Sequence, residues 1–336
     1  MEILFAGDLA RGTRSLQRLE ALRSLGHRVR AVQLDPIALY GRSWSLLRAG
    51  FSNLRLLWAL KSKGTELFWV EKGLLLHPDL LLDARRRHPG ICLACYSEDD
   101  MFAAHNRNSL YLRDLPLYDV VFTTKSYNAE PGELPSLGAR KVVFIDKAFH
   151  ATLHRPVEPG QEEKRRYGAD VGFIGSFEAE RAEAMLCLAE SGVRVRIWGN
   201  GWGPWRGRHP LLAVENRPIY SGEYVLALCA TKINLCFLRK INRDQQTDRS
   251  VEIPACGAFM LAERTEEHQR LFTEDREAVY FSDTLEMFAK VRYYLEHEAE
   301  RERIAAAGRC RCLEGGYDHG SRLRVMLTHC GAGGGA

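Results

Sequence analysis

Two acidic residues, Asp244 and Glu252, stand eight positions apart in the stretch "DQQTDRSVEIPACGAF". Glu252 lies among apolar residues, where a carboxylate loses solvation energy unless a polar group meets it. Pro254 predicts the start of a helix, which places Glu252 in the first helical turn. A carboxylate there can accept two hydrogen bonds from a ribose diol, or it can simply favour the helix dipole. Both interpretations remain open from the spacing alone.

The residues just before Glu252 are suited to anion binding. Thr247, Asp248 and Ser250 are favourable N-cap residues. A helix N-terminus offers free N–H groups and a partial positive charge, and Arg249 adds a planar guanidinium suited to phosphate. Arg249 and Ser250 are therefore candidate residues for binding an anionic ligand.

Two further loops contain residue types that contact phosphates or bases. In "VGFIGSFEAER", Gly175 and Ser176 make a strand-to-helix turn and Arg181 stands in the first helical turn. Glycine there permits close approach of the backbone to a phosphate, although many ordinary turns also contain Gly-Ser. In "WGNGWGPW", Gly199 and Asn200 lie among tryptophans, which indicates either base stacking or a packed turn.

Charged residues at other strand ends add to the candidates. Lys232 opens the apolar run "KINLCFL" and is either a phosphate contact or a salt-bridge partner. Glu98, Asp99 and Asp100 end the run "ICLACYSEDD". Three acids there are costly unless they bind polyols or accept a proton; an N-cap for the following helix is the alternative. Asp99, Asp100 and Asp244 are the candidate catalytic residues.

These residues stand at the ends of alternating strand and helix signals. Apolar runs separated by segments of helical spacing indicate parallel sheets covered on both faces. In the first half, strands are expected over 2–6, 28–34, 65–70, 91–96, 118–124 and 140–145, and helices over 13–27 and 78–87. In the second half, strands are expected over 170–176, 193–199, 232–238, 258–261 and 278–282, and helices over 178–191 and 285–313.

The alternation is interrupted over 154–170, where prolines, glycine and a charge cluster are typical of a surface linker. The fold class that follows is α/β, with two Rossmann-like domains facing a cleft. We predict an N-terminal domain over 1–155 and a C-terminal domain over 168–315. In such folds ligands lie beyond the carboxyl ends of the strands.

Composition limits the function classes. The chain has 336 residues and a net charge of +4, which is too mild to indicate nucleic-acid binding. It opens on "MEILFAGD", unlike a secretory signal, and no apolar run approaches the roughly 20 residues of a membrane span. The nine cysteines form no zinc pattern beyond the isolated pair Cys92 and Cys95, so we expect reduced, buried thiols in a cytoplasmic protein.

Several catalytic motifs are not supported. The first loop, "GDLARGT", lacks the G-x-G-x-x-G spacing of a nicotinamide site. The sequence contains no P-loop and no nucleophile elbow. Asp99 and Asp100 are adjacent and diverge on a strand, so they do not form an Asp-x-Asp metal motif. We therefore expect no metal and no cofactor.

The combination of motifs resembles a known family. "RSVEIPACGAFMLAERTEEHQRLF" followed by "LEMFAKVRYYLEHEAERERIAAAGR" resembles the C-terminal domain of family 1-type glycosyltransferases in the CgeB-like group. "YSEDDMFAAHN", "YDVVFTTKSYN", "LGARKVVFIDKAFHATLHRP" and "DVGFIGSFEAER" are similar to the N-terminal half and hinge of the same group. The resemblance covers nearly all of residues 1–325 and implies that a final helix over 316–329 packs on the N-terminal domain.

The resemblance implies a glycosyltransferase B (GT-B) fold that binds a nucleotide sugar between its halves without a metal. Retaining relatives carry Glu-x7-Glu, so Glu252 would hold the ribose of the donor and Asp244 the hydroxyls of the donor sugar. Gly175, Arg181 and Lys232 fall where the relatives contact the diphosphate. This chain departs from the pattern in having Asp as the first acid and "IPACGAF" in place of "AMACGxP".

The expected function is metal-independent transfer of a sugar from a nucleotide-sugar donor to an unidentified acceptor, with retention. Arginine, lysine and a helix dipole would stabilise the charge on the departing diphosphate. Two alternatives are a sugar-nucleotide 2-epimerase of the same fold and a non-catalytic nucleotide-sugar-binding protein of a glycan pathway. Release of free nucleotide diphosphate on addition of an acceptor distinguishes transfer from both.

One helical segment leaves two possibilities open. The basic, amphipathic stretch "SLLRAGFSNLRLLWALKSKG" over 45–64 can cover a sheet, or it can rest on a membrane surface to reach a lipid-linked acceptor. We favour core packing, because the apolar residues of this stretch suit a helix that covers a Rossmann sheet.

Overall fold

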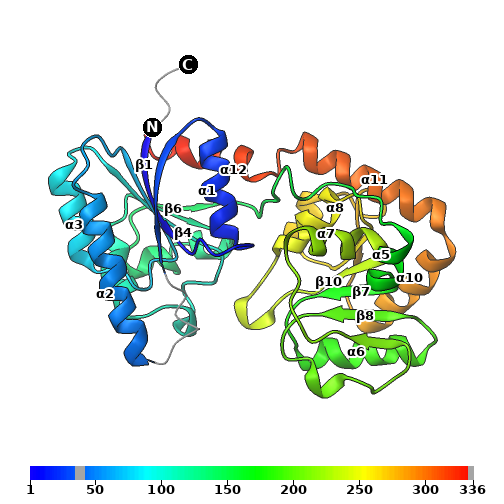
Figure 1. The fold of residues 1–336 in the computed structure, drawn as a ribbon. Coiled ribbons are helices and arrows are strands. Elements are labelled where there is room, and N and C mark those ends of the chain that lie inside the picture. Colours follow the sequence, from blue (N-terminus) through cyan, green and yellow to red (C-terminus); the bar gives the residue numbers. More distant parts are fainter. Residues whose placement is uncertain (35–41, 332–336) are drawn as a thin grey trace. The chain divides into compact units, whose positions relative to one another are not determined.

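The computed structural model describes residues 1–34 and 42–331, and between 42 and 49 it describes the backbone alone. The chain divides into two compact units. The first comprises Met1–Asp146 and the segment from His319 to the C-terminal end, and the second comprises Lys147–Asp318. Each unit is built on one six-stranded parallel sheet (Figure 1), which confirms the predicted α/β fold with two Rossmann-like domains.

The first unit has the strand order β2-β1-β3-β4-β5-β6. Its strands are β1 (Glu2–Gly7), β2 (Arg28–Gln33), β3 (Leu67–Glu71), β4 (Cys92–Ser97), β5 (Val120–Thr123) and β6 (Val142–Phe144). Its helices are α1 (Arg14–Ser24), α2 (Arg42–Ala59), α3 (Pro78–Arg87), α4 (Ser109–Asp114) and α12 (His319–Thr328). Helix α12, the C-terminal helix, packs against α1.

Alternate residues of these strands enter two different cores, because successive side chains of a strand point to opposite faces. Leu4 and Phe68 face a core with helices α2 and α3. Ile3 and Trp69 face a second core with helices α1 and α12. Burial on both faces is the reason that the inner strands β1 and β3 are nearly continuous apolar runs, whereas the edge strand β2 alternates.

The second unit has the strand order β12-β11-β10-β7-β8-β9. Its strands are β7 (Ala169–Ile174), β8 (Val195–Trp198), β9 (Leu212–Val214), β10 (Thr231–Cys236), β11 (Met260–Glu263) and β12 (Val279–Phe281). Its helices are α5 (Gln161–Tyr167), α6 (Ala179–Glu190), α7 (Ser221–Ala230), α8 (Asp248–Ala255), α9 (Glu266–Leu271), α10 (Thr284–Glu296) and α11 (Glu298–Glu314).

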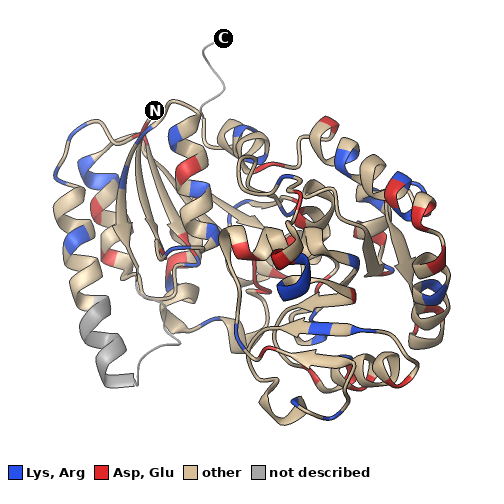
Figure 2. Cartoon of the chain, turned by 45° about the vertical axis from the view of Figure 1, so that its right-hand side comes forward, with Lys and Arg blue, Asp and Glu red and all other residues tan. Residues whose placement is uncertain are grey.

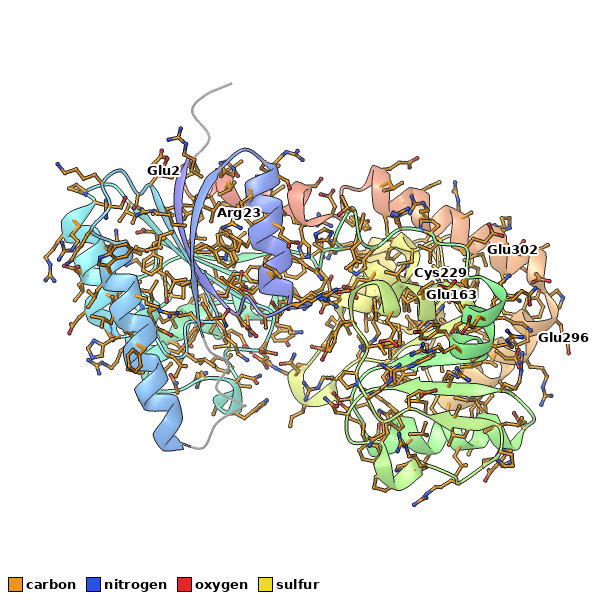
Figure 3. All side chains as sticks on the ribbon, in the orientation of Figure 1. Glu2, Arg23, Glu163, Cys229, Glu296 and Glu302 are labelled. Carbon is orange, nitrogen blue, oxygen red and sulfur yellow. The ribbon has the colours of Figure 1, made fainter. Side chains whose placement is uncertain are left out.

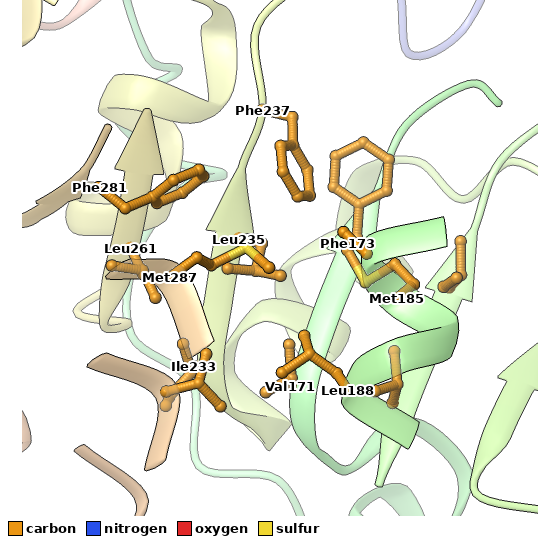
Figure 4. Close-up of a cluster of buried hydrophobic side chains, with 14 of the residues drawn as sticks. Val171, Phe173, Met185, Leu188, Ile233, Leu235, Phe237, Leu261, Phe281 and Met287 are labelled. Atoms are coloured by element: carbon orange, nitrogen blue, oxygen red, sulfur yellow. The ribbon is translucent and has the colours of Figure 1, made fainter. Parts of the chain in front are cut away.

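The core on one face of the second sheet joins β7, β10, β11 and β12 to helices α6 and α10. Figure 4 shows side chains from these elements in contact range of one another, and they include Val171, Phe173, Met185, Leu188, Ile233, Leu235, Leu261 and Met287. The other face carries a separate core, in which Met260 and Tyr280 pack with residues of α7 and α8. The second sheet is thus also covered on both faces.

The predicted charged helix over 285–313 is present as α10 and α11. Charges of both signs follow one another along α11 (Figure 2), and Glu296 and Glu302 project from the outer side of the two helices (Figure 3). Val291 and Ile304 of the same helices are buried in the core. The pair therefore covers the second sheet with one side and faces solvent with the other.

The predicted strands are confirmed, but β9, α4, α5, α7 and α9 were not predicted. Strand β9 has three residues, and α7 lacks a clear polar face because it is enclosed by core residues. Helix α5 lies inside the segment predicted as a linker over 154–170, and the two units divide instead at Asp146 and Lys147. The Glu163 side chain accepts a hydrogen bond from the Gly160 N–H at 2.7 Å, and this cap stabilises a helix too short to show periodicity.

Two expectations for the whole chain have different outcomes. All nine cysteines are free, but Cys187 and Cys310 are exposed, so the prediction of buried thiols was wrong for these two. Helical spacing does not distinguish a buried cysteine from a solvent-facing one when both lie on a charged helix.

Among the residues that the structure describes, no helix is long and apolar enough to cross a bilayer.

Asp114, at the end of α4, is a fully buried acid in the core of the first unit. Neither of its carboxylate oxygens has a hydrogen-bond partner among the described residues. Burial raises the pKa of Asp114 to about 8, although Arg113 acts in the opposite direction. The folded protein therefore holds this side chain protonated at neutral pH, whereas the unfolded chain ionises it.

We predict that Asp114→Asn stabilises the protein, and more so as pH rises. The folded-state pKa is raised, so the stability associated with the protonated acid is present below the unfolded pKa and is lost as pH rises toward about 8. Urea unfolding should show a gain of about 2–5 kcal/mol at pH 8 and a much smaller gain at pH 5. Glu302→Gln, a surface substitution, is the control. Equal gains at both pH values would contradict the assignment.

Candidate functional site

The second sheet has a topological switch point between β7 and β10. The chain proceeds from β7 outward to β8 and β9, and then returns to place β10 on the other side of β7. Loops that leave such a pair of strands diverge to opposite faces and leave a crevice at their carboxyl ends, where α/β proteins bind ligands. The predicted residues Gly175, Ser176 and Arg249 follow these two strands.

Arg249 joins the two strand ends. Its guanidinium donates from Nη1 to the carbonyl of Ile174 at 3.0 Å and from Nη2 to the carbonyl of Phe237 at 2.9 Å. Its Nε has no hydrogen-bond partner among the described residues, and its guanidinium lies 5.3 Å from the centre of the Phe173 ring. Hydrogen bonds to neutral carbonyl groups leave the net charge of the guanidinium in place, so Arg249 contributes a positive potential at the switch point.

Gly175 and Gly199 bring two loops of the second unit into close contact. A Cβ atom on Gly199 would lie 1.9 Å from the Gly175 carbonyl oxygen, and Gly199 has a φ of +143°. A Cβ atom on Gly175 would lie 2.6 Å from Cζ of the buried Phe173 ring and 3.3 Å from Nη1 of Arg249. Both positions therefore require glycine, and the backbone beside Arg249 carries no side chain.

The loop from Trp198 to Trp205 is a packed turn. Trp202 is fully buried and donates from Nε1 to the Gly175 carbonyl at 2.8 Å. The Asn200 carbonyl accepts the Phe177 N–H at 2.9 Å, so Asn200 supports the neighbouring loop through its backbone. Trp198 and Trp202 are buried and Trp205 is partly buried, so the structure favours the packed turn of the two interpretations.

Arg181 supports the same strand ends from α6 and is itself buried. It donates to the Leu238 carbonyl at 2.6 Å and to the Ser176 carbonyl at 3.3 Å, and it pairs with Glu178 at 2.9 Å. Burial lowers the pKa of Arg181, and the nearby charge of Arg249 lowers it further. Its donors bind protein groups, so Arg181 orders the loops at this edge.

Lys232 lies at the opposite edge of the sheet, which corrects its predicted contact with a diphosphate. It stands near the start of β10, level with the start of β7, and its Nζ pairs with Asp170 at 2.9 Å. Burial would raise the pKa of Asp170, but hydrogen bonds from Arg194 and Lys232 lower it to about 2. Of the two roles predicted for Lys232, phosphate contact and salt-bridge partner, the structure shows the salt bridge.

Helix α8 begins at Asp248, with Thr247 as its N-cap, and Pro254 lies inside the helix. The prediction that Pro254 starts the helix was therefore wrong. The Thr247 Oγ1 accepts the Arg249 N–H at 3.1 Å, and Ser250 Oγ accepts the Thr247 N–H at 2.9 Å. These bonds fix the turn from which the Arg249 side chain extends to the strand ends.

Ser250 is fully buried and serves as a link in a hydrogen-bond chain. Its Oγ lies 2.7 Å from Nε2 of His268, whose Nδ1 lies 2.6 Å from the Glu263 carbonyl oxygen. The Nδ1–H therefore donates to Glu263, and Nε2 accepts from Ser250. Burial lowers the pKa of His268 to about 4, so the ring is neutral at physiological pH.

Glu252 lies in the second turn of α8 and is fully buried, so it is not a helix-end charge. The Tyr224 hydroxyl donates to Glu252 Oε2 at 2.7 Å, and His154 Nε2 lies 3.6 Å from Oε1. The Tyr224 and His154 rings meet edge to face, 5.9 Å apart. Sequence reasoning missed both partners, which lie far from Glu252 along the chain.

Asp244 and Glu252 have different environments. Asp244 lies in the loop before α8 and is partly exposed. Its carboxylate accepts hydrogen bonds from the Asn242 side chain at 2.8 Å and from the Arg239 N–H at 3.3 Å. Arg243, at a φ of 44°, makes the turn that directs the chain into this loop. Asp244 is thus oriented but reachable, whereas Glu252 is enclosed.

In the first unit, the two catalytic candidates have separate roles. Asp100 is fully buried and accepts hydrogen bonds from the Phe102 N–H at 3.2 Å and the Asn128 side chain at 2.9 Å. Its carboxylate caps the turn after β4, so the proton-acceptor hypothesis does not fit Asp100. Asp99 is partly exposed and pairs with Lys72 at 2.5 Å.

A buried arginine beside these acids was not predicted. Arg18 of α1 donates to Glu71 at 2.8 and 2.6 Å and to Glu98 at 2.7 Å. Burial alone would lower the pKa of Arg18, but Glu71 and Glu98 hold it well above its ordinary value. This cluster joins the carboxyl ends of β3 and β4, and no local sequence signal could have found it because its members come from three separate elements.

Comparison with known proteins gives a consistent result. Residues 181–328 match the family described as glycosyl transferase-like. Sucrose-phosphate synthase from Thermosynechococcus elongatus has the same fold, with a TM-score of 0.68 at 13% identity over 98% of each chain. A glycosyltransferase from Rickettsia africae gives 0.67 at 10% identity, over 98% of this chain and 97% of its own. HepE of Anabaena, solved with UDP-glucose, gives 0.64 at 11% identity, over 98% and 99%. No curated protein matches the sequence.

The buried His268 predicts a specific loss of stability in acid. The pKa of His268 is about 4 in the folded state, so the unfolded chain takes up a proton first as pH falls below about 6.5. The unfolding free energy should fall by up to about 3 kcal/mol more in the wild type than in His268→Gln between pH 7 and pH 4. Urea titrations at several pH values measure this difference, with the exposed His105→Gln as control. Parallel pH profiles for wild type and His268→Gln would contradict it.

Proposed function

We propose that this chain, which has the GT-B fold and matches the glycosyl transferase-like family over residues 181–328, is a glycosyltransferase that takes its sugar from a uridine diphosphate sugar. We further propose that transfer retains the anomeric configuration and needs no divalent metal. UDP-glucose bound by the structural relative HepE supports the donor class. The spacing of Asp244 and Glu252, which resembles that of retaining relatives, supports retention.

The observation that carries the proposal is the position of Arg249 between the strand ends of β7 and β10. Its guanidinium lies at the switch point, beside a glycine backbone that a phosphate can approach. We propose that Arg249 contacts the diphosphate of the donor. When the glycosidic bond breaks, negative charge grows on the β-phosphate, and a cation fixed in advance lowers the barrier.

Within this proposal, Arg181 is a positioning residue. Its donors hold the Ser176 and Leu238 carbonyls, so it orders the loops on both sides of the diphosphate. Ser250 acts in the same indirect way, by fixing the first turn of α8 through His268. Gly175 and Gly199 keep the loop surface free of side chains.

We propose that Glu252 accepts hydrogen bonds from the ribose and that Asp244 accepts them from the donor sugar. The partly exposed Asp244 can do so as it stands. Glu252 must exchange the hydrogen bond that it accepts from Tyr224 for one from the ribose, since its carboxylate is enclosed in the free protein. The exchange conserves the number of hydrogen bonds to a buried charge, which is the condition for it to be favourable.

Two substitutions separate these roles. Glu252→Ala should weaken UDP binding by about 1.5–3 kcal/mol, the scale of a charged hydrogen bond. Asp244→Ala should leave UDP affinity nearly unchanged and lower turnover with the complete donor, because hydroxyl contacts orient the anomeric carbon. Calorimetry with UDP and an assay of UDP release measure the two effects.

Tyr224→Phe is the matched control for Glu252→Ala. It removes the hydrogen bond to Glu252 and keeps the carboxylate, so UDP affinity should be retained or improved. If Tyr224→Phe weakens UDP binding as much as Glu252→Ala, Glu252 acts by supporting the fold. Equal losses in Asp244→Ala and Glu252→Ala would also contradict the separate roles.

Metal independence has its own test. Transfer should continue undiminished in excess EDTA, because Arg249 and the first turn of α8 supply the positive charge that a divalent ion would otherwise provide. Turnover is measured before and after addition of the chelator, with manganese added back in a third sample. Complete loss in EDTA that manganese restores would rule the proposal out.

A further inference from the structure

Helix α2 has two apolar faces, only one of which is buried. Leu56 and Leu60 are fully buried in the core of the first unit. Phe51, Leu54 and Trp58 are 68%, 62% and 74% exposed. Because their spacings are three and four residues, these three side chains form one stripe on the side of the helix away from the core.

This exposed stripe is unlike the isolated apolar residues found on any protein surface. Single exposed leucines are ordinary, whereas contiguous large apolar side chains mark an interaction site. Leu57, on the same helix, is also partly exposed. In the sequence the spacing continues back to Leu47 and Trp44. The predicted core packing is present at Leu56 and Leu60, but it does not account for Phe51, Leu54 and Trp58.

All of the charged residues in and around α2 are basic. Residues 36–65 contain no Asp or Glu and five basic residues, Arg42, Arg48, Arg55, Lys61 and Lys63. Arg55, Lys61 and Lys63 are exposed. On α3, which packs beside α2, Asp79 pairs with His77, and Asp83 pairs with Arg86 and Arg87. Of the two acids of the neighbouring helix, Asp83 is thus matched by two arginines.

We propose that the outer face of α2 docks on an anionic membrane surface. Tryptophan and phenylalanine prefer the boundary between headgroups and acyl chains, and flanking lysine and arginine side chains are attracted to anionic headgroups. A helix with this pattern lies in the plane of the interface with its apolar face inserted. A second copy of the chain fits less well, because a two-fold contact would bring the same basic residues together. The proposal is independent of the donor assignment.

Vesicle sedimentation tests the docking. The wild type should bind vesicles in which about a third of the lipid is phosphatidylglycerol much more tightly than vesicles of phosphatidylcholine alone, and added salt should weaken the binding. Phe51→Ser/Trp58→Ser and Lys61→Glu/Lys63→Glu should each reduce binding by about tenfold or more. Leu285→Ser, which removes an exposed leucine of α10, is the matched control and should bind like the wild type.

Two further measurements keep the result unambiguous. UDP calorimetry and circular dichroism should be unchanged in both double variants, which shows that the fold and the donor site are intact. Absence of wild-type binding to anionic vesicles would overturn the proposal, as would binding that both double variants retain. Sedimentation equilibrium that reveals a dimer dissociated by Phe51→Ser/Trp58→Ser, without vesicle binding, would assign the face to a second copy instead.

Discussion

The structure depends on one constraint: both sheets are parallel and covered by helices on both faces. Side chains within such strands must be apolar, so polar chemistry is confined to the loops at the strand ends. In the second unit the strand order reverses between β7 and β10, and Arg249 joins these two ends through the Ile174 and Phe237 carbonyls. Arg249, a cation that links the diverging loops, therefore stands where the topology leaves room for a ligand.

The arrangement around α8 shows how this edge is kept in place. Ser250, His268 and the Glu263 carbonyl form a buried chain of hydrogen bonds that ties the first turn of α8 to the end of β11. Glu252, one turn further along, is enclosed by Tyr224 and His154. A buried carboxylate is tolerated only while it is hydrogen-bonded, so any ligand that reaches Glu252 has to replace the bonds it displaces. Ligand binding and local packing are thereby coupled at this residue.

Helix α2 carries apolar side chains on two of its faces, one buried and one exposed. A helix that only covers a sheet has one apolar stripe and a polar remainder. Here the inner stripe stabilises the core through Leu56 and Leu60, and the outer stripe with its surrounding cations is not needed for folding. Apolar side chains that face water without a packing role are costly for solubility, which is the physical reason to assign them a surface that they can enter.

The sequence by itself determined most of the strands and the strand-to-helix loop that follows β7, because burial on both faces of a sheet and local spacing are visible within a few residues. Arg249 and Gly175 were predicted at one edge and lie there together. Only the tertiary structure decided that Lys232 pairs with Asp170 at the other edge, that Asp100 caps a turn with Asn128, and that Glu252 is enclosed by Tyr224. Burial and hydrogen-bond partners are set by residues distant along the chain, and periodicity carries no information about them.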